Sequence, residues 1–435
     1  MLLTLEIVPA HEGDCLMLHW GTAADPKHAL IDGGPGDVYD KKLLPRINQI
    51  RASRGLNTPL KLSLVMVSHI DNDHITGVKK LFAGMEALVG GSPKKSPVLV
   101  DRLWHNTFND ILDDDVDEYY EQVTASFTAS VGGEPNPKIE SKVQSAFIAK
   151  GEPQADAEFQ ARVVSEILAG QPDGRDLRNS FEVLKAANWI KYSLNAPFTK
   201  AGKGTLIKVD KTPMSADIEG LQLAIYGPMQ AEIEALQAAF DQYIKSKGLN
   251  VEAVLAAYAD KSVPNLSSIV CYVGMKNGAG QPRTILLTGD ARGDKIIESL
   301  RNTKTLTGAS MHVTILKLPH HGSNRNLAPD FFTTITADHY VISADGKYGN
   351  PDCDTLKWLV EARGKSAVYD IYLTYKPKDI DAKHKAEVES KGKTWDEKTM
   401  SIELFFKSAV AQGYKFRYHQ GDVLKIDLGD ETLPW

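Results

Sequence analysis

Four side chains able to bind a metal ion stand within six residues of this chain, and they are His69, Asp71, Asp73 and His74. They follow the segment Leu62 to Val67, whose aliphatic and β-branched residues are typical of a buried strand. A strand that ends in this pattern and continues into a helix can direct imidazoles and carboxylates toward one point in space. A hydrolase that uses two divalent metal ions requires such a set of donors. The motif therefore predicts a catalytic metal centre.

An alternative interpretation treats these residues as a polar loop. In that loop Asp71 or Asp73 would cap the following helix, and the histidines would face solvent. Capping accounts for one carboxylate, whereas four donors stand close together here and further candidates follow downstream. The metal centre is the favoured interpretation.

A further carboxylate ends the apolar segment Thr284 to Thr288, where Gly289 precedes Asp290. A carboxylate at the end of a strand can bridge two cations. The alternative is that Asp290 caps a helix that begins near Asp294, and taken alone the residues leave both possibilities open.

Two adjacent histidines, His320 and His321, follow the apolar segment Val313 to Leu318 and precede Gly322 and Ser323. Neighbouring residues of an extended chain point to opposite sides. We therefore expect one of the two imidazoles to bind the metal while the other faces the substrate or supports a ligand. The alternative is a polar surface loop.

The elements that must position these residues alternate between strand and helix. The first half predicts strands at Leu2–Val8, Cys15–Trp20 and Ala29–Ile31, a helix near residues 41–54, and the strand before the metal motif. Helices are expected at 231–247 and 294–301. Further strands are expected at Val98–Trp104, Gly204–Val209, Leu221–Tyr226, Ser268–Val273, Thr284–Thr288, Val313–Leu318 and His339–Ser343. Two β-rich halves with helices outside predict two sheets packed face to face.

Two regions depart from this pattern. Residues 107–200 read as an acidic, mainly helical insertion, with helices at Ala146–Leu168 and Phe181–Leu194 and interruptions at 132–135 and 172–174. Residues 379–398 are charged and Lys-rich, which favours a solvated insertion over a grip on nucleic acid. Edge strands are expected at Thr399–Phe406, Lys415–His419 and Val423–Ile426.

Composition sets wider limits. The 435 residues are 42% apolar and 24% charged, as in ordinary globular proteins, and no apolar run reaches the length of about 18 residues expected of a membrane span. Cys15, Cys271 and Cys353 are too few and too scattered for a disulfide framework, so we expect a cytoplasmic protein in which they are core residues. The formal charge of −6 does not decide the substrate, because a local basic groove and bound metal ions suffice for phosphate.

The chain resembles the metallo-β-lactamase fold superfamily, and within it the hydrolase domain of the competence protein ComEC and its stand-alone relatives. The stretches that carry the resemblance are Gly13-Asp14-Cys15, Leu30-Ile31-Asp32-Gly33-Gly34-Pro35, Ser68 to His74, Asn265-Leu266-Ser267-Ser268, Leu287-Thr288-Gly289-Asp290, Leu318 to Ser323 and Tyr348-Gly349-Asn350-Pro351.

This resemblance implies an α+β fold, namely a four-layer αββα metallo-β-lactamase sandwich with a helical insertion and extra C-terminal strands. We assign residues 1–106 and 204–374 to the two halves of that domain, 107–203 to the insertion, and 375–435 to the charged insertion and the edge strands.

The resemblance also implies roles for individual residues, with one or two divalent ions as cofactor. His69 and Asp71 would help hold one ion, Asp73, His74 and one of His320 and His321 the other, and Asp290 would bridge them. Asp32 would orient a ligand histidine through its second ring nitrogen. Ser323 and Asn350 would contact phosphate.

Three positions depart from patterns usual in the superfamily, although the first of them, Asp71, matches the ComEC-like branch. Asp71 stands where the wider superfamily has His, and a carboxylate shifts the preference from Zn²⁺ toward Mn²⁺ or Mg²⁺. His105 is the sole histidine between residues 75 and 289, so the first ion either recruits it or has an open or water-completed position. Asn350 replaces a His and cannot donate a proton as an imidazolium does, so another group, such as His320 or His321, would act as general acid.

The expected activity is that of a metal-dependent phosphodiesterase, a nuclease acting on DNA, in which a water activated between the metals attacks phosphorus. The alternative is a hydrolase of a small phosphoester, cyclic nucleotide or lactone, with the helical insertion as a lid. A third hypothesis is a non-enzymatic partner that docks other proteins through residues 108–200 and keeps the metal for stability.

Overall fold

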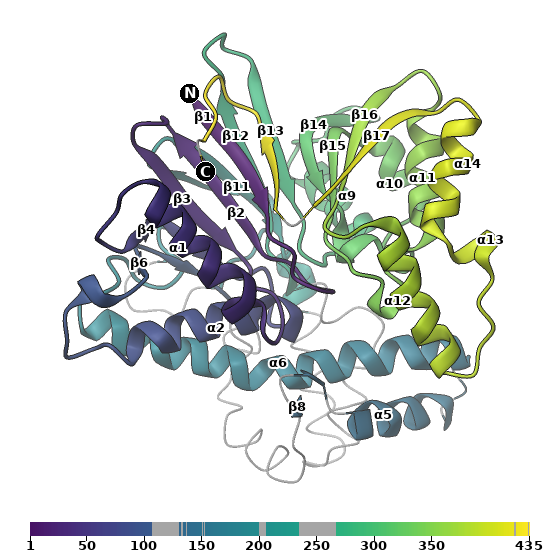
Figure 1. Cartoon of the computed structure of the whole chain (residues 1–435), viewed down its shortest axis with the longest axis horizontal. Coiled ribbons are helices and arrows are strands. Elements are labelled where there is room, and N and C mark those ends of the chain that lie inside the picture. The colour runs from purple at the N-terminus through teal and green to yellow at the C-terminus, as the bar shows by residue number, and fades with distance from the viewer. Residues whose placement is uncertain are drawn as a thin grey trace.

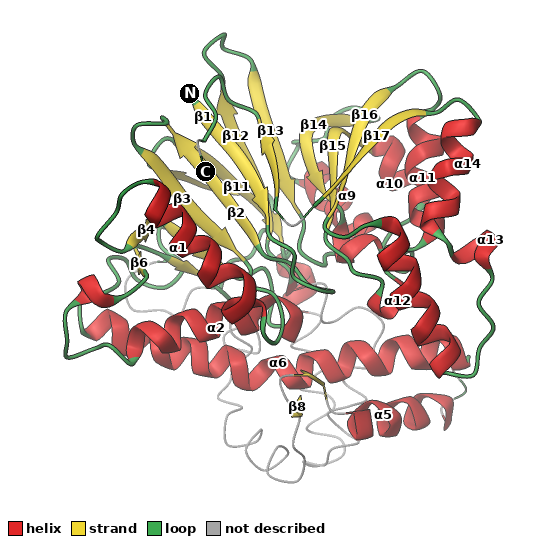
Figure 2. Cartoon of the chain, viewed as in Figure 1, coloured by secondary structure: helices red, strands yellow, loops and turns green. Residues whose placement is uncertain are grey.

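A computed structural model describes residues 1–106, 130–131, 134–135, 137–149, 151, 153–199, 206–234, 267–421, 423–433 and 435. Two large mixed sheets dominate the described chain, and helices lie on their outer faces (Figure 1, Figure 2). Two further sheets have two strands each. The expected α+β class is confirmed at this level, and its identification as a metallo-β-lactamase sandwich stays a prediction.

The first large sheet has six strands and is built mainly from the N-terminal part of the chain. Its strands from β18 to β3 are antiparallel, and those from β3 to β7 are parallel. In spatial order they are β18 (Leu424–Asp427), β1 (Leu2–Ile7), β2 (Leu16–Gly21), β3 (Pro26–Ile31), β5 (Leu64–Met66) and β7 (Leu103–Trp104).

The second large sheet has eight strands, antiparallel from β10 to β13 and parallel from β13 to β17. In spatial order they are β10 (Met214–Ile218), β11 (Leu221–Gly227), β12 (Val270–Lys276), β13 (Pro282–Leu287), β14 (Met311–Lys317), β15 (Ile335–Ile342), β16 (Val368–Leu373) and β17 (Lys415–Gln420).

The remaining elements surround these sheets. The small sheets pair β4 (Leu60–Leu62) with β6 (Val98–Val100) and β8 (Ser130–Val131) with β9 (Glu134–Pro135). The α-helices are α1 (Leu44–Ser53), α2 (Asn72–Glu86), α5 (Pro137–Ala149), α6 (Gln154–Ala186), α9 (Gly293–Asn302), α10 (Pro329–Thr334), α11 (Cys353–Arg363), α12 (Pro377–Ser390), α13 (Glu397–Met400) and α14 (Ile402–Ala411). Short helical turns are η1 (Tyr39–Leu43), η2 (Pro93–Lys95), η4 (Pro319–Gly322) and η5 (Lys347–Gly349).

The two large sheets share one buried apolar cluster, which joins Trp20 and Met66 of the first sheet to Ile225 and Ile315 of the second. A separate cluster covers the outer face of the first sheet with α1, α2 and α6. A third covers the outer face of the second sheet with α9, α10, α11 and α14. All six residues of β1 are buried because both of its faces are covered.

The loops that carry the sequence motifs follow parallel strands. The segment from Ser68 to Asp71 follows β5, Asp290 follows β13, and the two histidines of η4 follow β14. The carboxyl ends of neighbouring parallel strands lie at one edge of a sheet, where ligands commonly bind. The topology therefore gathers the candidate ligands.

The interruption expected at residues 172–174 is wrong, because α6 runs without a break from Gln154 to Ala186. Proline removes a helical N–H, which destabilises an isolated helix. Here Asp173 accepts a hydrogen bond from Thr76 and pairs with Lys79, both on α2. Packing against α2 thus supports α6 at the place where its sequence alone disfavours a helix.

The strand expected at Thr399–Phe406 is also wrong, because this segment forms the end of α13 and the first half of α14. Ser401 caps α14 by accepting from the N–H of Leu404, and Asp381 of α12 accepts from the N–H groups of Ile402 and Glu403. These contacts satisfy the N–H groups that a helix start leaves unpaired. A neighbouring helix therefore stabilises the α14 start.

Other expectations vary in outcome. The remaining predicted strands fall on observed strands with shifted ends, except Gly204–Val209, whose described part makes only an isolated bridge from Val209 to Met229. Most of the helix expected at 231–247 lies outside the described residues, as do residues 107–129. Cys15, Cys271 and Cys353 are free thiols. Within the part of the chain that is described, no helix has the length and apolarity needed to cross a membrane.

Candidate metal centre

Buried side chains from both large sheets meet in one acidic and histidine-rich group. Asp14, His74, Asp290 and His321 each offer one possible ligand atom, and these atoms lie within 4.8 Å of one another. All four residues are buried. The group could hold a metal ion, because carboxylate oxygens and imidazole nitrogens are common ligands of divalent ions.

The ring atoms of His74 and His321 define one side of this group. Their Nε2 atoms lie 3.2 Å apart. Nε2 of His74 is 3.4 Å from Oδ1 of Asp290, and Nε2 of His321 is 3.5 Å from Oδ2 of the same carboxylate. Oδ2 of Asp73 lies 3.5 Å from Nε2 of His321 and 3.8 Å from Nε2 of His74. Four donors thus face one small space.

His69 and Asp71 also lie close to Asp290. Nε2 of His69 is 3.3 Å from Oδ2 of Asp71 and 3.9 Å from Oδ2 of Asp290. Among the described residues, Nε2 of His69 and one oxygen each of Asp71 and Asp290 are buried without a hydrogen-bond partner. Buried polar atoms normally have partners, so these atoms are suited to bind a cation.

Asp71 and Asp290 do not cap helices. Asp71 stands at the N-cap position of α2 but makes no capping hydrogen bond, and the N-cap of α9 is Arg292 rather than Asp290. Their carboxylates point into the group instead. The helix-capping interpretation of these two residues therefore fails.

His320 and His321 are not extended, contrary to the expectation from sequence. Both have positive φ, 46° and 55°, and Gly322 continues this left-handed turn with φ 85°. Nε2 of His320 is therefore 3.7 Å from Oδ2 of Asp290, close to the corresponding distance for His321. Because the backbone is left-handed, both imidazoles face Asp290 rather than opposite sides.

Asp32 and Ser68 orient the histidines of the first motif. Nδ1 of His74 lies 3.0 Å from Oδ2 of Asp32, and the Ser68 hydroxyl donates to the same oxygen at 2.7 Å. Because this hydroxyl donates to Asp32, it can accept from Nδ1 of His69 at 3.0 Å. Both arrangements leave Nε2 directed at the group, which is how supporting hydrogen bonds orient metal ligands.

A close backbone approach positions Asp32. Gly33 and Gly77 pack so tightly that a Cβ on Gly77 would lie 2.0 Å from the carbonyl oxygen of Gly33. Any side chain at either position would separate α2 from the loop after β3. The two glycines therefore keep Asp32 within reach of His74.

His321 is oriented by the backbone of the second sheet. Its Nδ1 lies 2.8 Å from the carbonyl oxygen of Ser343, just after β15, and an acceptor-only carbonyl requires Nδ1 to carry the proton. Nε2 of His321 is therefore the ring nitrogen that faces Asp290, and it becomes a possible metal ligand when it loses its proton. Ser343 was not predicted from sequence, because its contribution is a backbone carbonyl.

Asp14 and Lys317 form a buried ion pair that was not predicted as part of the site. Lys317 is 1% exposed, and its ammonium contacts Asp14 and the Gly289 carbonyl at 3.3 Å. Oδ1 of Asp14 faces Nδ1 of His321 at 3.8 Å, behind the imidazole. Asp14 is thus engaged by Lys317 on the far side of the rings. The Gly-Asp-Cys stretch of the resemblance was the one sequence signal for it.

The electrostatics of the group favour bound positive charge. Burial alone would lower the pKa of His74 and His321, but the carboxylate of Asp290 outweighs it, and the pKa of His321 rises to about 10. Burial lowers the pKa of His320 to about 4, so His320 is neutral at pH 7. A metal ion bound here would displace protons from His74 and His321, so its affinity rises with pH.

His105 lies apart from the metal-binding group. It is completely buried, both ring nitrogens are without a hydrogen-bond partner among the described residues, and burial lowers its pKa to about 3. A Cβ on Gly174 of α6 would lie 3.7 Å from its Nε2 and from a methyl group of Ile70. His105 thus packs under the metal loop against the insertion.

Ser323 and Asn350 lie on neighbouring turns. Ser323 donates its N–H to the carbonyl of His320 at 2.8 Å, and a Cβ on Gly322 would lie 2.9 Å from Cβ of Pro351. Asn350 is 6% exposed and precedes Pro351 through a cis peptide bond. Both residues therefore lie beside the loop that carries the two histidines.

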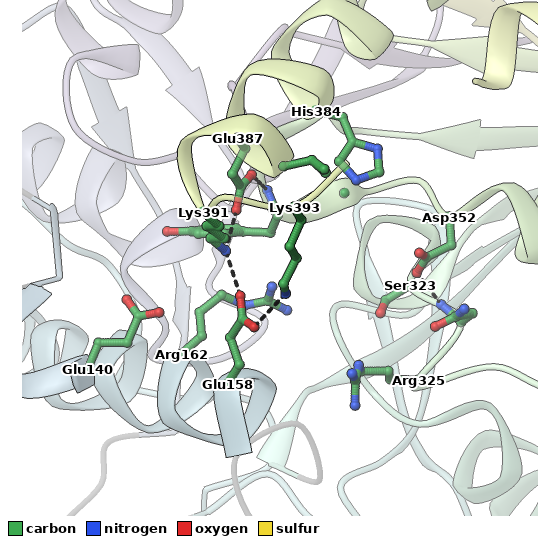
Figure 3. Close-up of a pocket in the computed structure, with 14 residues that line it drawn as sticks. Glu140, Glu158, Arg162, Ser323, Arg325, Asp352, His384, Glu387, Lys391 and Lys393 are labelled. Atoms are coloured by element: carbon green, nitrogen blue, oxygen red, sulfur yellow. Dashed lines mark hydrogen bonds and ion pairs between the residues drawn. The ribbon is translucent and has the colours of Figure 1, made fainter. Parts of the chain in front are cut away.

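A cleft with a volume of about 290 Å³ begins at Ser323, two residues after His321. Figure 3 shows that its walls come from the segment Ser323 to Arg325, from α6, and from α12 with the residues that follow it. Arg162, Arg325, Lys391 and Lys393 contribute positive charge, and Glu140, Glu158, Asp352 and Glu387 contribute acidic groups. The cleft is polar, which suits a charged ligand.

No protein-family model matches the chain, and no curated protein has a significantly similar sequence.

Proposed function

We propose that this protein is a metal-dependent hydrolase of phosphodiesters with a metallo-β-lactamase fold. The observation that carries the proposal is the position of Asp290, a buried carboxylate that has an imidazole near each of its oxygens. Nε2 of His74 lies 3.4 Å from Oδ1 of Asp290, and Nε2 of His321 and of His69 lie 3.5 and 3.9 Å from Oδ2. A carboxylate in that position suits a pair of divalent ions.

The geometry supports an assignment of ligands to two positions. His69, Asp71 and His320 would serve one, Asp73, His74 and His321 the other, and Asp290 both. His320 then fills the place that the sequence left open, because its neutral imidazole faces Asp290. When bound, the ions would lower the pKa of a water molecule and polarise a phosphoryl oxygen.

The residues around these positions have distinct parts in the proposed reaction. Asp32, Ser68 and the Ser343 carbonyl hold the ring tautomers that direct Nε2 inward. Lys317 keeps Asp14 compensated, so this carboxylate adds no unpaired charge behind the ligands. The cleft from Ser323 onward would hold the rest of the substrate.

Phosphodiesters are favoured over other esters because cationic side chains line the cleft next to the candidate metal centre. DNA is the first substrate to test, since the resemblance is to hydrolase domains of DNA-uptake proteins. Arg162, Arg325, Lys391 and Lys393 would act locally, so the overall charge of −6 is compatible with an anionic substrate.

A small phosphodiester is the second candidate, and one observation favours it. Asp156 of α6 pairs with Arg325 at 2.8 Å, and Glu158 pairs with Lys391 and Lys393 at 2.9 and 2.8 Å. One turn of α6 is thus ion-paired both to Arg325 and to the lysines after α12. These pairs restrict the width of the cleft. This arrangement suits a short substrate better than a duplex.

The test is hydrolysis of bis-p-nitrophenyl phosphate, single-stranded DNA and plasmid DNA with Mn²⁺, Mg²⁺ or Zn²⁺. We expect metal-dependent cleavage that Asp73→Ala and Asp290→Asn each reduce by more than about a hundredfold, because each removes a charged ligand. Asp294→Ala is the control, since Asp294 is 56% exposed and pairs only locally with Arg292.

The outcomes separate the candidates. Cleavage of the small ester without cleavage of DNA supports the second candidate. Metal binding without turnover of any phosphodiester would refute the proposed function.

A further inference from the structure

Two lysines that follow each other closely after α12 converge on a single carboxylate in the cleft. Nζ of Lys391 lies 2.9 Å from Oε1 of Glu158, and Nζ of Lys393 lies 2.8 Å from Oε2 (Figure 3). Glu158 comes from α6, more than two hundred residues away in sequence. One carboxylate therefore occupies a position that two ammonium groups surround.

The electrostatics keep Glu158 and Lys391 charged at neutral pH. Burial raises the pKa of Glu158, but the hydrogen bonds from Lys393 and Lys391 outweigh it and lower the pKa overall. Burial lowers the pKa of Lys391, but its contacts with Glu387 and Glu158 raise it overall. The position therefore selects an anion.

We propose that Lys391 and Lys393 form a phosphate subsite, and that the carboxylate of Glu158 stands where a second phosphate group of the substrate binds. This inference rests on the proposed phosphodiesterase function and specifies its substrate. The substrate is then a short nucleotide strand or strand end that carries a terminal phosphate in addition to the phosphodiester to be cleaved.

Phosphate can displace Glu158 for two reasons. A terminal phosphate carries more charge than a carboxylate and offers three oxygens to the two lysines. The lysines are 40% and 53% exposed, so a ligand can reach them without unfolding the wall. Binding of the terminal phosphate is expected to weaken with salt, because it depends on charge. It is expected to strengthen when the carboxylate of Glu158 is neutralised, because Glu158 competes for the two lysines.

The size of the cleft sets the length of the substrate. Its volume of about 290 Å³ is at the small end of the range for ligand pockets. Ser323, beside the metal-binding loop, and the lysines after α12 belong to different walls of the cleft (Figure 3). A cleft of this volume suits one or two nucleotides rather than a duplex, which favours cleavage from an end.

The experiment compares two dinucleotides, d(TpT) with and without a 5′-phosphate, which differ only in the terminal phosphate. We expect wild-type kcat/KM to be about tenfold or more higher for the phosphorylated form, because two charge-assisted contacts are added. Lys391→Met with Lys393→Met should reduce this ratio to near one, because the contacts specific to the terminal phosphate are then removed. Glu158→Gln should raise the ratio.

Lys385→Met is the matched control, because Lys385 lies on α12, just before the two lysines, is 51% exposed and pairs with Glu389 away from the cleft. It should leave the ratio unchanged. A wild-type ratio near one, or a ratio that the lysine variants do not alter, would overturn the subsite.

A binding measurement distinguishes failure of the proposed function from failure of the phosphate subsite. If neither dinucleotide is hydrolysed, calorimetric titration of both in Ca²⁺ still measures the subsite. Tighter binding of the phosphorylated form in wild type but not in the double lysine variant supports the subsite alone, and equal binding overturns it.

Discussion

Asp71 is the candidate ligand whose side-chain type bears most directly on the choice of metal. Its carboxylate is 3.3 Å from Nε2 of His69 and is nearly excluded from water. Burial raises the pKa of Asp71, opposed by the nearby imidazole of His69. A bound cation would reverse that rise, because it stabilises the charged carboxylate.

Asp71→His is expected to shift the preference for metal from Mn²⁺ toward Zn²⁺ by at least about tenfold, because an imidazole replaces an oxygen ligand with a nitrogen ligand. Competition with a chromophoric chelator measures both dissociation constants. Asp294→His, at an exposed position, is the control. An unchanged ratio of the two constants would place Asp71 outside the metal-binding set.

At the scale of elements, a buried ion pair joins β1 to α1 on the outer face of the first sheet. Glu6 accepts from Nε and Nη2 of Arg46 at 2.6 and 2.8 Å, and both residues are buried. Burial raises the pKa of Glu6, but the hydrogen bonds from Arg46 and His19 outweigh it and lower the pKa from 4.5 to about 2. The charged form of Glu6 is therefore stabilised by folding.

Because the folded-state pKa of Glu6 lies below its value of 4.5 in the unfolded chain, the stabilisation is present above pH 4.5 and is lost as the pH falls toward 2. Its size is about 3 kcal/mol. Glu6→Gln should lower the free energy of unfolding at pH 7 by about that amount, since Arg46 loses its partner.

Urea unfolding from pH 7.5 to 3 measures this effect as the difference between wild type and variant, which should narrow as the pH falls below about 4.5. Glu403→Gln is the control, because Glu403 is 39% exposed and pairs with Lys407 on the surface. A difference that stays constant with pH would show that Glu6 contributes through packing rather than charge.

At the scale of the whole molecule, the candidate metal centre connects the two large sheets. His69 to His74 follow β5 of the first sheet, whereas Asp290 and His321 follow β13 and β14 of the second. A metal ion held by both groups would add a link between halves that also meet through apolar packing and the Asp14–Lys317 ion pair. Metal binding should therefore stabilise the fold as a unit.

Added Mn²⁺ at about one hundred times its dissociation constant should raise the free energy of unfolding by about 2.7 kcal/mol, and a chelator should reverse the effect. Thermal unfolding measured with and without metal tests this. Asp290→Asn should remove most of the increase, because Asp290 contacts donors from both sheets. Equal stabilisation of this variant would mean that the metal binds elsewhere.

Much of the site was predictable because its signals are local. Possible metal ligands at the ends of apolar segments can be recognised from sequence, because the apolar residues of a strand and the polar residues that follow it are neighbours in the chain. His69, Asp71, Asp73, His74, Asp290 and the two histidines of η4 were all identified in this way. The mixed class of the fold followed from the same alternation of strands and helices.

Tertiary structure decided what depends on distant partners. The pairing of Asp14 with Lys317 joins residues about three hundred positions apart, and the left-handed turn at His320 and His321 fits them to Asp290. Contacts with α2 support α6 where Pro172 would disfavour a helix. Hydrogen bonds to Asp381 stabilise the start of α14, in a segment whose sequence resembles a strand. Local patterns determine which residues are apolar or able to bind a metal. Burial and long-range contacts, which no local window contains, determine how those residues face one another.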